Sequence, residues 1–213
     1  MIVAIDGPAG SGKTTVAKIL AEKLRISYLD TGATYRALTY AALIKKIDLT
    51  DSNLLKKLAE EIDLKLDKGK VYFSNQEITD EIRKPIIDKN ISIVVSHPLV
   101  REVMVGLQRK LSKHGDFVVE GRDITTVVFP ESKHKFYLDA DPKIRIQRRH
   151  RELSEKGLNI EFKEVKIDLE KRDLADKNRQ IGPLVVSEDA IYIDTSNLSI
   201  EQTADEILKQ ILR

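Results

Sequence analysis

The chain has 213 residues, of which 41% are hydrophobic and 33% charged, and its formal net charge at pH 7 is +2. This composition is typical of a globular domain, and the near balance of charge gives no reason to expect binding to nucleic acid or to a membrane surface. Cysteine is absent, which excludes disulfides and thiolate metal ligands. We read no signal peptide at the N-terminus and expect a cytoplasmic location.

The first predicted element is a short buried strand at residues 2–5, followed by the letters GPAGSGKT. These letters fit the phosphate-loop pattern G-x-x-x-x-G-K-[ST], and a helix is predicted next, over residues 16–24. Glycines allow the backbone N–H groups to point at phosphate oxygens, and the positive end of the helix adds to the anion site. We expect Lys13 to reach the β- and γ-phosphates and the Thr14 hydroxyl to ligate Mg²⁺.

Short strands and helices alternate along the rest of the chain. The further predicted strands cover residues 26–30, 117–120, 135–139 and 190–194. Such brief apolar runs are typical of strands covered on both faces, so we expect a parallel sheet with helices on both sides and a last helix over residues 201–211, after Ser199. Ligands of such sheets bind beyond the carboxyl ends of the strands, where Asp30, Glu120 and Asp139 should lie.

Two segments depart from this alternation. A β-hairpin with a turn at residues 67–69 is predicted between Asp63 and Asn75, followed by polar sequence and by a helical stretch over residues 86–111. The second segment, residues 144–157, is predicted to be one helix that Gly157 ends. It carries Arg145, Arg148, Arg149 and Arg151. No aromatic residues are interleaved with them, which disfavours a nucleic-acid surface.

Several arginines could assist phosphoryl transfer, in which the protein aligns the reactants and neutralises charge. Besides the segment just described, the candidates are Arg36, Arg101, Arg122, Arg172 and Arg179. Arg36 and Arg122 closely follow strand ends, and the spacing of Arg172, Asp176 and Arg179 predicts one stripe on a helix. The simpler alternative for any single arginine is a solvated helix face.

Taken together, these pieces resemble the bacterial cytidylate kinases, a family of nucleoside monophosphate kinases. The resemblance is carried by IDGPAGSGKTT, LDTGATYR, SHPLVREVM, EGRDITTVVFP, KFYLDA, KRDLADKNR and DTSNLSIEQ, which span nearly the whole chain. It implies an α/β, three-layer P-loop kinase fold with a five-stranded parallel sheet. It also implies a single domain, in which a core carries a monophosphate-binding insert and an arginine-rich lid. The core would comprise residues 1–60, 112–143 and 160–213, the insert residues 61–111 and the lid residues 144–159.

The resemblance also implies roles for individual residues. The ATP-binding residues would be Gly7, Pro8, Ala9, Gly10, Ser11, Gly12, Lys13, Thr14, Thr15 and, from the lid, Arg148. The CMP-binding residues would be Thr31, Tyr35, Arg36, Ser92, Arg101, Arg122, Asp123, Arg172, Asp176 and Arg179. The catalytic residues would be Lys13, Arg122, Arg172 and Arg179. The cofactor would be Mg²⁺, bound with ATP.

Within the CMP set, Ser92, Arg101 and Asp123 would read the base. A carboxylate accepts from the exocyclic amino group of cytosine and repels the carbonyl oxygen that uracil has there. Two positions depart from the family pattern: Glu120 stands where aspartate is frequent, and Thr14 where glycine is frequent. The role of Glu120 is therefore open, and Thr15 could share the metal with Thr14.

The expected reaction is ATP + CMP (also dCMP) ⇌ ADP + CDP, catalysed by a monomer. Two alternatives stay open. The first is a P-loop kinase for another small acceptor, such as UMP, shikimate or dephospho-coenzyme A, which an acceptor panel would reveal. The second is a non-catalytic ATP-binding or nucleic-acid-binding module, which would show no CMP-dependent production of ADP.

Overall fold

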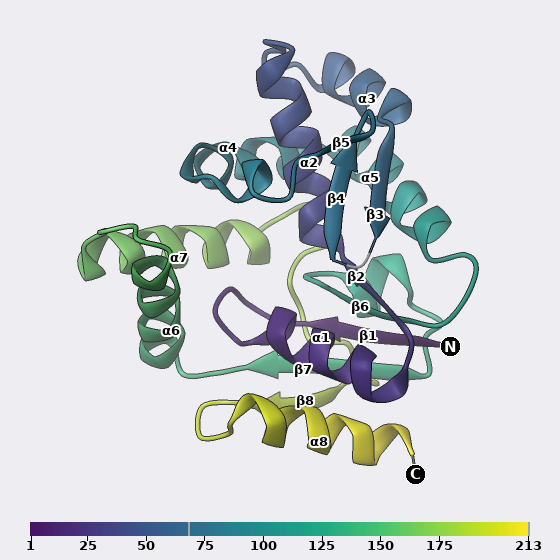
Figure 1. The fold of residues 1–213 in the computed structure, drawn as a ribbon, viewed down its shortest axis with the longest axis vertical. Helices are drawn as coiled ribbons and strands as arrows, with labels where there is room; N and C mark the ends of the chain where they lie inside the picture. Colours follow the sequence, from purple (N-terminus) through teal and green to yellow (C-terminus); the bar gives the residue numbers. More distant parts are fainter. Residues whose placement is uncertain (68, 213) are drawn as a thin grey trace. The chain divides into compact units, whose positions relative to one another are not determined.

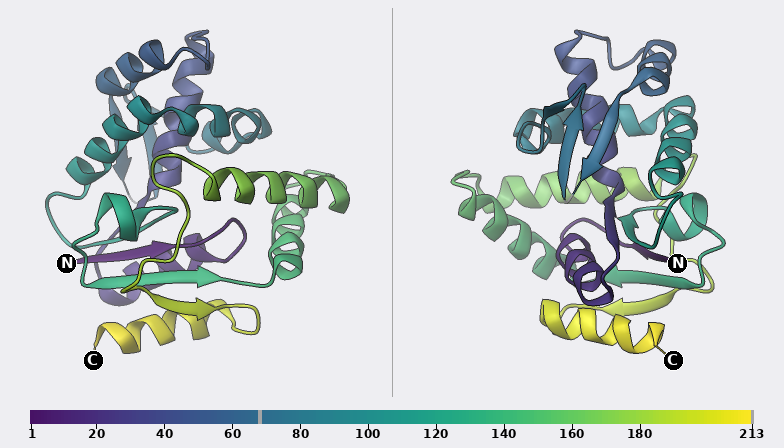
Figure 2. Two further views of the ribbon diagram at one scale, coloured as in Figure 1. Left: turned by 180° about the vertical axis from the view of Figure 1, so that it is seen from behind. Right: turned by 45° about the vertical axis from the view of Figure 1, so that its right-hand side comes forward.

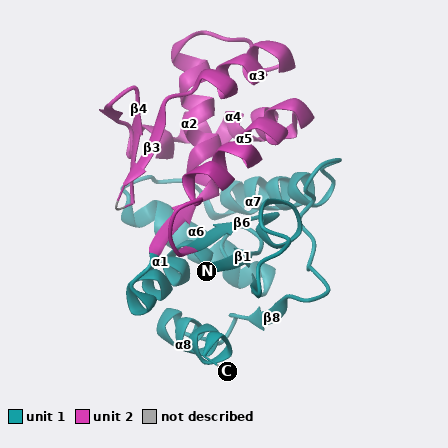
Figure 3. Ribbon diagram, turned by 90° about the vertical axis from the view of Figure 1, so that its right-hand side faces the viewer, with its two compact units in different colours: residues 1–26, 118–213 teal, residues 27–117 magenta. Residues whose placement is uncertain are grey.

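A computed structural model of the chain describes residues 1–67 and 69–212. The chain divides into two compact units, which Figure 3 colours separately. Unit 1 comprises residues 1–26 and 118–213, and unit 2 comprises residues 27–117. Each unit is described by itself.

A five-stranded parallel sheet with flanking helices confirms the predicted fold class. Its strand order is β2-β6-β1-β7-β8. The strands are β1 (Ile2–Asp6), β2 (Ser27–Asp30), β6 (Phe117–Gly121), β7 (His134–Asp139) and β8 (Ile191–Asp194). Ile5 of β1 lies opposite Phe136 of β7, and Leu138 of β7 lies opposite Ile193 of β8. All five predicted strands are therefore present.

Burial explains why these strands read as continuous apolar runs. Val3, Ala4 and Ile5 of β1 are fully buried, as expected for a central strand covered on both faces. At the edge of the sheet, Ile191 and Tyr192 of β8 are exposed instead.

Apart from its strands, the described part of unit 1 contains four helices and one π-helical turn. They are α1 (Lys13–Leu24), α6 (Pro142–Glu155), α7 (Phe162–Lys177), α8 (Ile200–Ile211) and the turn η2 (Ile124–Val128). Helices α1 and α8 lie side by side (Figure 1). A capping box formed by Ser199 and Gln202 starts α8, which confirms the helix predicted after Ser199.

Helices α6 and α7 pack against each other in unit 1 (Figure 2). Ile146 and Leu153 of α6 and Val165 and Leu169 of α7 form their shared apolar cluster. The prediction of one helix ended by Gly157 is confirmed, since α6 ends at Glu155 and Gly157 has a φ of 75°, which favours glycine.

Unit 2 contains the predicted hairpin among four helices. Besides β2, its elements are α2 (Thr31–Ile44), α3 (Ser52–Glu61), β3 (Leu64–Asp67), β4 (Lys70–Phe73), β5 (Gln76–Glu77), η1 (Glu81–Arg83), α4 (Pro85–Ser96) and α5 (Pro98–Leu111). Strands β3 and β4 are antiparallel, which confirms the hairpin, while residue 68 of its predicted turn lies outside the described residues. Strand β5 and the 3₁₀ turn η1 were not predicted, because their sequence is short and polar.

The prediction of a single helical stretch over residues 86–111 is wrong in one respect. It is two helices, α4 and α5, which meet at His97. Proline disfavours helical backbone at the preceding residue and is well suited to the first turn of a helix. Pro98 therefore holds His97 in an extended conformation and begins a new helix.

Small side chains allow the helices of unit 2 to approach closely. Ala33, Ala37 and Ala41 of α2 are buried in the main apolar core, next to Leu55 of α3 and Met104 of α5. None of the helices within residues 1–67 and 69–212 has both the length and the apolar character to cross a membrane.

Candidate active site

The phosphate loop lies between β1 and α1 in unit 1, and its shape requires glycine. Gly10 has a φ of 76°, and a Cβ atom there would lie 2.7 Å from the carbonyl oxygen of Arg145. A Cβ atom on Gly7 would lie 2.0 Å from the carbonyl oxygen of Leu138. Gly12, with a φ of 89°, stands at the N-cap of α1. Positive φ angles at Gly7, Gly10 and Gly12, together with the close backbone contacts of Gly7 and Gly10, therefore favour glycine at these three positions.

Lys13 folds back over this loop. Its Nζ donates to the carbonyl oxygen of Pro8 at 2.7 Å and lies 3.4 Å from Ser11 Oγ. Burial and the positive charge of Arg122 together lower the pKa of Lys13 to about 7, although the negative charge of Glu120 opposes the shift. The ammonium group of Lys13 is therefore held at the loop with little water around it, where an arriving phosphate would favour its charged form.

Thr14 and Glu120 form the part of the site that suits a metal ion. The Thr14 hydroxyl donates to Glu120 Oε1 at 2.5 Å, and Glu120 is buried at the carboxyl end of β6. A hydroxyl and a carboxylate are the oxygen ligands that Mg²⁺ prefers. Thr14 and Glu120 thus fit the expected cofactor, Mg²⁺. Thr15, the alternative ligand considered from the sequence, is exposed.

Asp6, the last residue of β1, is a functional candidate that sequence reasoning missed. Its carboxylate accepts hydrogen bonds from the backbone N–H groups of Ile124 and Thr125, both at 2.8 Å, and from the Thr125 hydroxyl at 2.6 Å. Burial raises the pKa of Asp6 to about 6 despite these hydrogen bonds. Asp6 thereby fixes the start of η2, directly after Asp123. The signal available in the sequence was an acidic residue at the end of a predicted strand, as at Asp30.

Arg122, Asp176 and Arg179 are brought together as a buried charge cluster. Arg122 Nε donates to Asp176 Oδ2 at 2.9 Å, and Arg179 Nη2 lies 3.1 Å from Asp176 Oδ1. Burial alone would raise the pKa of Asp176, but the charges of Arg122, Arg179 and Arg172 hold it below its usual range. Two guanidinium groups on one carboxylate leave net positive charge, which suits a phosphate ligand.

The predicted helical stripe of Arg172, Asp176 and Arg179 is wrong at its last member. Helix α7 ends at Lys177, so Arg179 lies beyond it. The carbonyl oxygen of Asp176 accepts from the N–H of Leu184 at 2.8 Å, which takes the place of a continued helical hydrogen bond. Arg179 still reaches Asp176, three positions earlier, and its Nε donates to the carbonyl oxygen of Asp176 at 3.3 Å.

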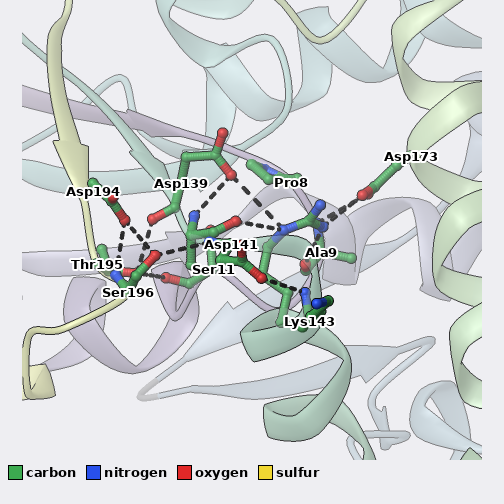
Figure 4. A network of polar contacts seen from close by, with 12 residues as sticks. Pro8, Ala9, Ser11, Asp139, Asp141, Lys143, Asp173, Asp194, Thr195 and Ser196 are labelled. Atoms are coloured by element: carbon green, nitrogen blue, oxygen red, sulfur yellow. Dashed lines mark hydrogen bonds and ion pairs between the residues drawn. The ribbon is translucent and has the colours of Figure 1, made fainter.

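Thr195 links three parts of unit 1 at the phosphate loop, and Figure 4 shows it beside Ser11 and Asp139. Its hydroxyl lies 3.1 Å from the carbonyl oxygen of Ser11 and 2.9 Å from that of Asp139. Arg148 of α6 donates to the Thr195 hydroxyl at 3.0 Å and to its carbonyl oxygen at 2.7 Å. The structure thus places Arg148 beside the loop. Sequence reasoning missed Thr195, which has no motif of its own.

Unit 2 contains five of the predicted residues, whereas Asp123 is buried in unit 1, directly before η2. Arg101 is buried, with its guanidinium carbon 5.6 Å from the centre of the Tyr35 ring, so these two lie together. Thr31 is buried in the first turn of α2, and Ser92 is exposed on α4. Arg36 donates to the carbonyl oxygen of Ile82 at 3.2 Å.

Arg36 also has a charged partner that sequence reasoning missed. Its Nη2 donates to Asp88 Oδ1 at 2.5 Å, and both side chains are mostly buried. The guanidinium of Arg36 is therefore held on two sides by residues of η1 and α4.

The parallel sheet, the glycine loop that leads into α1, and the lysine and arginines around that loop together define a nucleotide-dependent phosphotransferase of the P-loop kinase class. The sequence profile described as "Cytidylate kinase" matches residues 3–213. The chain belongs to the cytidylate kinase family, which confirms the resemblance seen in its motifs.

Curated relatives match along nearly their whole length. A cytidylate kinase from Caldanaerobacter subterraneus subsp. tengcongensis is 43% identical, over 98% of this chain and 93% of that protein. A cytidylate kinase from Clostridium botulinum is 42% identical, over 99% of this chain and 97% of that protein. Among solved structures, an uncharacterised protein from Eubacterium ventriosum has a TM-score of 0.54 at 18% identity, covering 99% of this chain and 98% of that one. The last likeness concerns the fold alone.

Proposed function

We propose that this chain transfers the γ-phosphoryl group of ATP to CMP, and also to dCMP, giving ADP and CDP. The observation that carries the proposal is the family match over residues 3–213, supported by curated cytidylate kinases of about the same length at 42–43% identity. The phosphate loop of unit 1 supplies the chemistry that such a reaction requires.

On the donor side, the backbone N–H groups of the loop would hold the phosphates of ATP. Lys13 would place its ammonium group on the β- and γ-phosphates and stabilise the charge that develops during transfer. Thr14 and Glu120 would hold Mg²⁺, which when bound with ATP neutralises phosphate charge. Arg148 would contact ATP from the lid formed by residues 144–159.

On the acceptor side, Arg36 and the cluster of Arg122, Arg172 and Arg179 would bind phosphate groups. Asp176 would accept from the ribose hydroxyls, and its position between two arginines orients it for that task. The residues proposed to line the rest of the CMP pocket are Thr31, Tyr35, Ser92, Arg101 and Asp123. Within unit 2, we propose that residues 61–111 are the monophosphate-binding insert.

Closure of the insert and the lid would exclude water, which otherwise competes with CMP for the phosphoryl group. We further propose that the protein works as a monomer in the cytoplasm, where both of its nucleotide substrates occur.

Substitution of Asp123 tests the proposed recognition of cytosine. Asp123→Ala would remove a charged acceptor worth about 1.5–3 kcal/mol, so kcat/KM for CMP should fall roughly 10- to 150-fold. Steady-state kinetics with CMP and UMP measure this effect. An unchanged preference for CMP over UMP would contradict the role of Asp123.

The reaction itself is tested with an acceptor panel. The purified chain is supplied with Mg·ATP and, in turn, with CMP, dCMP, UMP, AMP and shikimate, and ADP production is followed. We expect the highest kcat/KM with CMP or dCMP. Preference for another acceptor, or no acceptor-dependent ADP at all, would overturn the proposal.

A further inference from the structure

An ion pair between α6 and α7 holds both backbone polar groups of one phosphate-loop residue. Arg145 Nη1 donates to the carbonyl oxygen of Ala9 at 3.0 Å and to Asp173 Oδ2 at 2.5 Å. The N–H of Ala9 points to the other oxygen of the same carboxylate, Asp173 Oδ1, at 3.4 Å. Figure 4 shows Asp173 facing Ala9 across this contact.

The pair is shielded from water and fixed from a second side. The side chains of Arg145 and Asp173 are only 9% and 13% exposed. Arg145 Nε donates to the carbonyl oxygen of Ala140 at 3.1 Å and lies 3.8 Å from Asp139 Oδ1, at the carboxyl end of β7. Burying an ion pair often adds little stability, because removing two charges from water offsets their attraction. Stability is therefore a weak reason for this arrangement.

The backbone of α6 touches the loop at the next residue as well. The carbonyl oxygen of Arg145 lies so close to Gly10 that a Cβ atom there would be 2.7 Å away. Ala9 and Gly10 thus rest on the side chain and the backbone of the same arginine. The part of the loop that follows carries the N–H groups expected to bind phosphate.

We propose that Arg145 and Asp173 are positioning residues for ATP binding. They fix the Ala9–Gly10 turn, so that the N–H groups after it converge on one anion site before the nucleotide arrives. Such preorganisation strengthens binding by reducing the entropy lost on association. In this arrangement Arg145 serves the loop itself, unlike Arg148 of the same helix. The inference rests on the proposed function only for the identity of the donor nucleotide.

The test measures binding by calorimetry, without turnover. Mg·ATP and CMP are titrated separately into the wild-type chain, Asp173→Asn and Arg145→Lys. We expect the Kd for Mg·ATP to rise roughly 10- to 100-fold in both variants, because each misplaces the loop, while the Kd for CMP stays within about twofold. Glu170→Gln is the matched control, since Glu170 forms an exposed ion pair with Lys166 on the same helix. It should bind both nucleotides as the wild type does.

A double variant separates positioning from folding. Arg145→Met with Asp173→Leu replaces the pair with apolar side chains, which buried sites tolerate well, so it should fold yet bind Mg·ATP as weakly as Asp173→Asn. An unchanged Kd for Mg·ATP in a folded variant, or equal weakening for Mg·ATP and CMP, would overturn the proposal. If the wild type binds Mg·ATP but not CMP, the proposed function fails while the ATP comparison still decides this inference.

Discussion

Lys13 and Asp6 are buried ionisable groups at the two ends of the phosphate loop. Burial shifts the pKa of each in the direction that favours its neutral form. The pKa of Lys13 falls to about 7 and that of Asp6 rises to about 6. An arriving phosphate would favour the charged form of Lys13, and their attraction would act with little water around it, in a low dielectric. The burial of Lys13 within the loop thus explains why the site suits a triphosphate.

Replacing Lys13 removes the one loop side chain expected to carry positive charge to the phosphates. Lys13→Ala should lower kcat roughly 100- to 1000-fold, because a preorganised charge is lost from the transition state. Steady-state kinetics measure the loss, and circular dichroism checks the fold. Lys18→Ala, which changes an exposed residue of α1, is the control. Near-normal turnover by Lys13→Ala would rule out this role.

Asp6 should make stability depend on pH. Its pKa is about 6 in the native state and near 3.8 when exposed, so between these values the native state binds more protons than the unfolded state. The contribution of Asp6 is therefore present below about pH 3.8 and lost as pH rises through 6. This amounts to a fall of up to roughly 3 kcal/mol relative to Asp6→Asn. Urea unfolding of both proteins across this range measures it, and a gap that does not change with pH would contradict it.

Helix α8 shows how a local signal acts at the scale of an element. Ser199→Ala removes the hydroxyl that accepts from the N–H of Gln202 at 3.1 Å and so opens the capping box. The loss should be about 1 kcal/mol in the free energy of unfolding, with kcat unchanged, because α8 carries no proposed site residue. Urea denaturation measures it, and Ser199→Thr, which keeps a hydroxyl, should recover most of the stability. Equal losses in both variants would mean that the cap is not the cause.

Elements also determine where the candidate site residues lie within each unit. In unit 1, the carboxyl ends of β1, β6 and β7 provide Asp6, Glu120 and Asp139 around one loop. In unit 2, α2 presents Thr31 and Tyr35 from its first turns. The arrangement in unit 1 follows from the parallel sheet, whose strands all end at the same edge.

At the scale of the whole molecule, ATP should stabilise the protein, because it binds only where the loop is folded. At 100 times its Kd, Mg·ATP adds about 2.7 kcal/mol, and for a chain of this length about 2–4 °C accompanies each kcal/mol. We therefore expect a rise in Tm of about 5–11 °C by differential scanning fluorimetry. EDTA should reduce the rise if Mg²⁺ binds with ATP, and an equal rise with and without EDTA would contradict the metal assignment.

Local patterns in the amino-acid sequence were sufficient to predict the five strands of the parallel sheet, the phosphate loop and the helix after Ser199. Each depends on neighbouring residues: an apolar run, a spacing of glycines, or a cap directly before a helix. The break between α4 and α5 was local too, since Pro98 marks it, but a long helical pattern obscured it.

Only the tertiary structure decided how the charged residues are partnered. Asp6 and Thr125 lie 119 positions apart in the chain, and Ala9 and Asp173 lie 164 apart. Nothing in the spacing of the letters indicates that such residues meet, because the sheet and the helix packing bring them together. A few consecutive residues thus determine the chemistry of the loop. The residues that hold the loop in place are distant in the sequence, and only the fold brings them to it.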